Sequence, residues 1–134
     1  MNRPPRALLE VTPGEVLDRI TILAVKRTRL SSDELTAQLD EGLSRARSAW
    51  SEVVGRSPAV DAAAATQLER DLQELNERLW RAEDRIRAHD RRSEWGEAFV
   101  EVAREICRLN DRRADLKNQV DGLFGLGAQK KIYE

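Results

Sequence analysis

The sequence predicts an all-α fold, an antiparallel four-helix bundle in which the last two helices are long and form a hairpin. Helix-forming residues dominate the 134-residue chain, glycine and proline fall at segment edges, and no stretch alternates apolar and polar residues as a strand would. A chain of this length can bury a hydrophobic core without a disulfide or metal. We expect one domain over residues 1–134, with an N-terminal tail at 1–11 and a C-terminal tail at 123–134.

The first helix is predicted by the sequence "TPGE". Thr12 is typical of an N-cap, Pro13 of a first helical position, and Glu15 of a capping-box acid, so a helix is expected from here to about residue 30. Apolar residues, among them Ile22, occur on nearly all faces of this segment. The helix is therefore expected to be central to the fold, or to be covered by a partner chain or the C-terminal tail.

Three further helices are predicted from caps, breaks and hydrophobic spacing. "SSDE" offers Ser31 as the next N-cap, and that helix is expected to continue to Gly55. Residues 60–90 repeat leucine, alanine or isoleucine at alternating spacings of four and three, which is typical of a long bundle helix. "HDRRS" interrupts this pattern, and Ser93 is expected to cap a fourth helix that runs to Gly122.

Composition narrows the function classes. Lys+Arg 23 against Asp+Glu 24 leaves a net charge of −1, which argues against nucleic acid or an anionic membrane as a partner. His89 is the one histidine and Cys107 the one cysteine, so we expect no metal site, and Cys107 is expected to be a small buried thiol. No cofactor motif is found. With no signal peptide or membrane span in evidence, we expect a cytoplasmic protein.

Polar residues occur where the fourth helix should face the core. On a helical wheel, Asn110, Arg113 and Lys117 fall on the same arc as the apolar residues of the first half of that helix. A buried unpaired charge costs several kcal/mol, on the order of the stability of a small domain. These side chains therefore need partners, either within the chain or from a ligand.

The partners are expected from the first and third helices. Hairpin pairing places Asn76 opposite Asn110 and Glu69 near Lys117, and Asp18 or Glu15 of the first helix is expected to neutralise Arg113 or Lys117. Lys26 is expected to approach Glu83 or Asp84. The candidate ligand-binding cluster is Glu15, Asp18, Lys26, Asn76, Trp80, Glu83, Arg87, Asn110, Arg113 and Lys117.

The polar cluster leaves two interpretations open. In one, a hydrogen-bonded ionic network fixes the helix register, with Arg and Lys reaching toward solvent. In the other, a polar pocket between helices binds an anionic group through Arg113 and Lys117, with Glu83 or Asp18 as acid, base or orienting residue. No catalytic residue can be assigned on this basis.

Three stretches together carry a family resemblance: "TPGEVLDRITILAVKRTRL" at 12–30, "LNERLWRAEDRIR" at 75–87 and "ICRLNDRRADLKNQV" at 106–120. They resemble a family of short bacterial all-helical proteins that remains a domain of unknown function. The resemblance implies no activity and no catalytic residue. It implies only that members sometimes accompany surface-polysaccharide and glycosyltransferase functions in bacterial genomes.

The sequence favours a non-catalytic helical interaction or accessory domain, linked through the resemblance to bacterial metabolite or polysaccharide pathways. The alternative is a small all-α enzyme or ligand-binding protein that acts on an anionic metabolite in an interhelical polar pocket, so enzymatic activity is left open. A homo-oligomer, a protein partner and an anionic small molecule are the partners considered. Homodimerisation through the first helix would involve Ile22.

Overall fold

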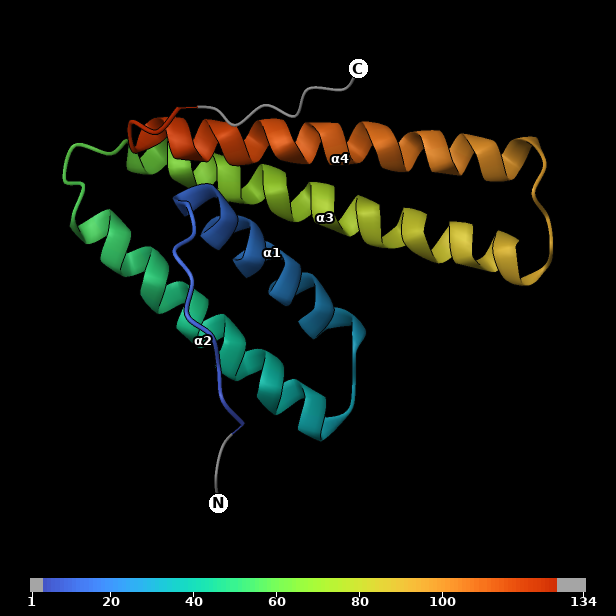
Figure 1. Cartoon of the computed structure of the whole chain (residues 1–134), viewed down its shortest axis with the longest axis horizontal. Helices are drawn as coiled ribbons and strands as arrows, with labels where there is room; N and C mark the ends of the chain where they lie inside the picture. Colours follow the sequence, from blue (N-terminus) through green and yellow to red (C-terminus); the bar gives the residue numbers. More distant parts are fainter. Residues whose placement is uncertain (1–3, 128–134) are drawn as a thin grey trace.

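The computed structural model describes residues 4–127, and this part of the chain contains four α-helices and no strand. The helices are α1 (Pro13–Arg29), α2 (Asp33–Gly55), α3 (Ala62–Arg91) and α4 (Glu97–Leu123) (Figure 1). The predicted all-α class is therefore confirmed. None of the helices in the described range is long and apolar enough to cross a membrane.

The N-terminus of α1 forms as its sequence predicts, whereas that of α2 is shifted by one residue. The Thr12 hydroxyl accepts a hydrogen bond from the Glu15 backbone N–H at 3.3 Å. For α2 the cap is Ser32, whose hydroxyl accepts from the Leu35 N–H at 3.4 Å, and the prediction of Ser31 is wrong. Both serines offer the same hydroxyl, so only the position of the first helical turn distinguishes them.

The expected cap of α4 is also wrong. Ser93 has a φ of 56° and its N–H donates to the Asp90 carbonyl at 3.0 Å, so it belongs to the turn that closes α3. The helix α4 begins four residues later, after Gly96, which makes no side-chain cap. The sequence "RRSEWG" therefore ends α3 and forms the turn that leads into α4.

The central element is α1, which packs against α2, α3 and α4. Among the helices, α2 packs against α1, and α3 and α4 lie side by side as a hairpin that extends well beyond the end of α1 (Figure 1). This arrangement explains why α1 is apolar on most faces, since Leu17, Ile20 and Val25 are all almost completely buried. Intramolecular burial thus accounts for most of its apolar residues, whereas Val16 and Ile22 are only partly buried.

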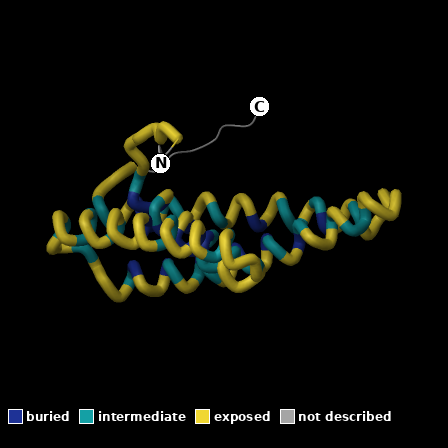
Figure 2. Tube along the Cα trace, turned by 90° about the horizontal axis from the view of Figure 1, so that it is seen from below, coloured by how far each residue is buried: buried dark blue, intermediate teal, exposed yellow. Residues whose placement is uncertain are grey.

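The hydrophobic core lies where α1 covers the hairpin. Buried positions recur along the facing sides of the helices, and the end of the hairpin is mostly exposed (Figure 2). The core comprises Leu17, Ile20, Ala46, Leu68, Leu72, Leu75, Leu79, Ala82, Val102, Leu109, Leu116 and Val120. Trp50 of α2 also packs edge-on against Phe124, which follows α4, with ring centroids 5.6 Å apart. Cys107 is exposed, contrary to prediction, because it lies off the Val102–Leu109–Leu116 seam of α4.

Candidate functional site

A buried carboxylate, Asp18, joins α1 to both helices of the hairpin. Its Oδ2 accepts from Arg113 Nη2 at 2.6 Å, and its Oδ1 accepts from Arg113 Nε at 2.9 Å and from Asn76 Nδ2 at 3.1 Å. The Asp18 side chain is 6% exposed and that of Arg113 30% exposed. This two-pronged geometry is the strong form of an Arg–carboxylate pair. It realises the predicted neutralisation of Arg113 by Asp18.

Thr21 completes this network one turn further along α1. Its hydroxyl donates to the Asp18 carbonyl at 2.7 Å and accepts from Asn76 Nδ2 at 2.8 Å. Asp18, Thr21 and Asn76 are all buried. Among the described residues, no buried side-chain nitrogen or oxygen lacks a hydrogen-bond partner. The network therefore has the properties expected of a structural polar core.

A second buried carboxylate, Asp121, was not singled out by the sequence. Its Oδ1 accepts from the Gly14 backbone N–H at 2.7 Å, and it is 4% exposed. A Cβ on Gly14 would lie 2.3 Å from the Lys117 carbonyl oxygen, so only glycine permits α1 to approach α4 this closely. An acid at a helix N-terminus satisfies a free N–H and complements the helix dipole. The one sequence feature that could have indicated a buried acid here is the position of Asp121 directly after the apolar Val120.

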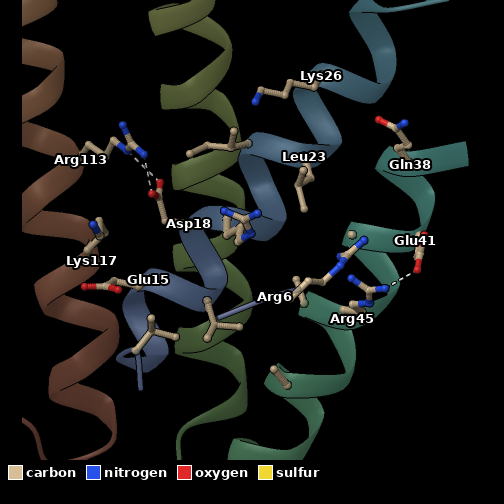
Figure 3. Close-up of a pocket in the computed structure, with 17 residues that line it drawn as sticks. Arg6, Glu15, Asp18, Leu23, Lys26, Gln38, Glu41, Arg45, Arg113 and Lys117 are labelled. Carbon is tan, nitrogen blue, oxygen red and sulfur yellow. Dashed lines mark hydrogen bonds and ion pairs between the residues drawn. The ribbon is translucent and has the colours of Figure 1, made fainter. Parts of the chain in front are cut away.

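A cationic groove of about 900 Å³ opens on an adjacent face of α1 and has Asp18 and Arg113 of the buried network at its edge. It lies over α1, with α2 along one side and α4 along the other (Figure 3). The N-terminal segment before α1 also contributes to it. The groove is lined by Arg6, Val11, Glu15, Val16, Asp18, Arg19, Ile22, Leu23, Lys26, Gln38, Glu41, Gly42, Arg45, Ala46, Ala49, Arg113 and Lys117.

The charges of the cationic groove do not balance. Six of the lining residues are Lys or Arg and three are Asp or Glu. Of the three acids, Asp18 is engaged by Arg113, Glu41 forms an ion pair with Arg45, and the Glu15 side chain forms no ion pair within residues 4–127. The side chains of Lys26 and Lys117 have no ion pair or hydrogen bond within residues 4–127. Both are half-buried, so the groove holds cations that the described chain leaves without a counterion.

A second hollow, which we call the Trp80 pocket, has a volume of about 560 Å³ and shares Ile22, Lys26 and Arg113 with the cationic groove. Its charges are nearly matched, and Glu83 lies 3.8 Å from Arg87 in a largely exposed pair. The pocket is lined by Ile22, Val25, Lys26, Asn76, Leu79, Trp80, Glu83, Asp84, Arg87, Asn110 and Arg113.

The ten predicted cluster residues thus divide between the buried network and the two hollows. Asp18, Asn76 and Arg113 form the network. Glu15, Lys26 and Lys117 line the cationic groove, and Lys26, Trp80, Glu83, Arg87 and Asn110 line the Trp80 pocket.

Two expected placements are wrong. Asn110 is exposed rather than on the core face, because the packed seam of α4 is formed by the preceding residue, Leu109, and its heptad neighbours. Glu69 does not pair with Lys117, since both of its oxygens accept from Arg47 of α2, at 3.1 and 3.3 Å. A helical wheel gives the angle of a residue but not the position at which a neighbouring helix stops covering it.

No group of three or more His, Cys, Asp or Glu residues in the described range is placed to hold a metal ion. Comparisons of the chain with protein-family models, with curated proteins and with solved structures give no match. The chemistry of the two hollows must therefore be inferred from their own residues.

Proposed function

We propose that this protein is a non-catalytic binding domain, built as an antiparallel four-helix bundle, whose cationic groove takes an anionic partner. The observation that carries this proposal is the charge imbalance of the groove, where six cations face three acids and Lys26 and Lys117 form no ion pair with any described residue. A partner carrying carboxylates or phosphates would supply the missing counterions and would be steered toward the groove by its field.

The engagement of the buried acids supports binding rather than proton transfer. Asp18 accepts three hydrogen bonds from Arg113 and Asn76, and Asp121 accepts one from the start of α1. A general acid or base must reach the proton that it moves in a substrate. Either carboxylate would have to give up contacts that hold α1 in place before it could do so.

Thermal shift measurements test the proposal. Sodium tripolyphosphate, citrate and poly-L-glutamate are titrated into the wild type, into the Lys26→Gln/Lys117→Gln double variant and into an Arg70→Gln control. Arg70 is exposed on α3 and lines neither hollow. A ligand at about one hundred times its Kd stabilises the folded state by about 2.7 kcal/mol.

We expect at least one of these anions to raise the Tm of the wild type and of the control, and the shift to be lost in the double variant. Equal shifts in all three proteins, or no shift with any anion, would overturn the proposal. The shift should also shrink with added NaCl, because salt screens exposed charges.

A second candidate function is favoured by the lining of the Trp80 pocket. Lys26, Arg113 and the half-buried Trp80 converge there beside Glu83, a combination that suits a small anionic metabolite and leaves a carboxylate for acid–base chemistry. Under this alternative the protein is a small all-α ligand-binding protein or enzyme. It predicts that Trp80→Ala abolishes metabolite-induced stabilisation while the Lys117→Gln variant retains it, and the opposite pattern would reject it.

A further inference from the structure

We propose that the partner of the cationic groove is an acidic amphipathic α-helix, which lies over α1 between α2 and α4. This inference rests on the proposed function and specifies its ligand. The occupant is chosen on charge complementarity, on the spacing of the residues that line the groove, and on the apolar surface between its cations.

The groove presents residues at the spacing that one helix offers to another. Among the residues of α1 that line the groove, Glu15, Arg19, Ile22 and Lys26 lie at steps of four, three and four, with Val16, Asp18 and Leu23 beside them. This is the spacing of a single helical stripe, and it is the pattern into which a neighbouring helix packs its side chains. The 17 residues of α1 extend for about 25 Å, enough to contact several turns of a docked helix.

The wall formed by α2 contains a stripe with the same spacing, in which two residues are small. Gln38, Gly42, Arg45 and Ala49 lie at steps of four, three and four, with Glu41 and Ala46 beside them. Glycine inside a helix costs about 1 kcal/mol relative to alanine. A Cβ at Gly42 would make only ordinary contact with the Leu23 side chain, at 3.6 Å, so packing within the described chain does not require glycine there. The bare backbone leaves room for the backbone of a partner helix to approach closely.

Apolar side chains occupy the groove between the cations, so the partner needs an apolar face. Ile22 and Val16 are only partly buried, and Ala49 is exposed. A small polyanion would neutralise Lys26 and Lys117 but would leave these side chains in contact with water. A helix with an apolar face and acidic flanks covers both, which is the helix-in-groove mode of recognition.

The N-terminal segment adds apolar surface beside the same groove. Arg6 and Val11 line it, and between them Leu8 and Leu9 are 98% and 86% exposed. This segment stands off the helices in a second view of the molecule (Figure 2). Leu8 and Leu9 do not line the groove, but they lie between two residues that do and so offer exposed apolar surface next to a helix seated there.

Fluorescence anisotropy with labelled peptides of about 20 residues, the length that spans α1, tests this inference. One peptide places leucines at helical spacing with glutamates on both flanks. A second has the same composition but distributes its leucines around the helix. We expect the amphipathic peptide to bind at least tenfold more tightly than the scrambled one. The two carry the same charge, so the difference in affinity measures the contribution of a continuous apolar face.

The binding position is tested by two charge substitutions on α2. Ala49→Glu places an acid in the groove at an exposed position, so the fold is retained and the amphipathic peptide should bind at least tenfold more weakly. Ser48→Glu adds the same charge to the same helix one residue away, where it does not line the groove, and should leave binding nearly unchanged.

The outcomes separate the helix from the more general proposal. Equal affinity for the two peptides, or equal effects of Ala49→Glu and Ser48→Glu, would overturn the helical partner. If neither peptide binds while tripolyphosphate still stabilises the protein through Lys26 and Lys117, the helix inference fails and the anion-binding proposal stands. Absence of binding by peptides and small anions alike overturns both.

Discussion

Polar residues around α1 differ in whether they have hydrogen-bond or ion-pair partners. Toward the hairpin, Asp18, Thr21 and Asn76 are buried and fully hydrogen-bonded. Toward the cationic groove, Lys26 and Lys117 have no partner in residues 4–127 although both are half-buried. The contact between α1 and the hairpin thus holds a closed polar network, and the adjacent groove presents an open charged surface.

This difference indicates which polar residues hold the fold and which remain available to a partner. A satisfied buried network fixes the position of a helix, and removal of one member leaves the others without partners. A cation at the edge of a groove retains access to water and contributes little to folding. Substitutions on the two sides of α1 should therefore separate stability from binding.

The largest effect is expected for Asp18→Ala on the buried side. Arg113 and Asn76 would lose the carboxylate that accepts three hydrogen bonds from them. We expect the free energy of unfolding, measured by urea denaturation, to fall by about 3 kcal/mol. The control Asp40→Ala breaks the exposed Arg27–Asp40 pair and should cost no more than about 0.5 kcal/mol. If Asp18→Ala and Asp40→Ala lowered the free energy of unfolding by similar amounts, the buried network would contribute no more to stability than an exposed ion pair.

Gly14→Ala should follow, with a loss of about 2 kcal/mol, because its Cβ would be forced against the Lys117 carbonyl at 2.3 Å. The matched change, Gly55→Ala, adds a Cβ with no atom within 4 Å, so the free energy of unfolding should stay within about 0.5 kcal/mol of the wild-type value. Chemical denaturation measures both. An unchanged midpoint for Gly14→Ala would contradict the close contact between α1 and α4.

Gly42→Ala is expected to act in the opposite direction. It removes a helix-interior glycine where the added Cβ fits, so stability should rise by about 0.5–1 kcal/mol. The same methyl group narrows the cationic groove and should weaken binding of the amphipathic peptide. A lower Tm would show that the position is already crowded, and tighter peptide binding would argue against close approach of a helix.

The smallest effects on folding are expected for Lys26→Gln and Lys117→Gln. With no counterion to lose among the described residues, each should change the free energy of unfolding by less than about 0.5 kcal/mol. Thermal denaturation without ligand measures this. A loss above about 1 kcal/mol would assign the lysine to the structural network rather than to the open surface.

The helices and part of the polar cluster could be predicted because their signals are local or periodic. The capping sequence at Thr12 set the start of α1, and the cation at Arg113 on an apolar arc required an acid that Asp18 supplies. Asp121 could not be assigned, since its partner is a backbone N–H at the far end of the chain. Asn110 was misplaced because the packed seam of α4 runs through Leu109, and which side of a helix its neighbours cover is a feature of tertiary geometry that periodicity does not contain.

The most direct test of the contrast between the two sides of α1 is a residue-resolved ¹H–¹⁵N NMR titration with poly-L-glutamate. We expect the backbone signals of the groove-lining residues of α1, α2 and α4, including Arg19, Gly42 and Lys117, to shift in a saturable way. Signals of exposed cations elsewhere, such as Arg70 and Arg92, should move little. Shifts spread evenly over all exposed Arg and Lys residues would contradict a specific cationic groove.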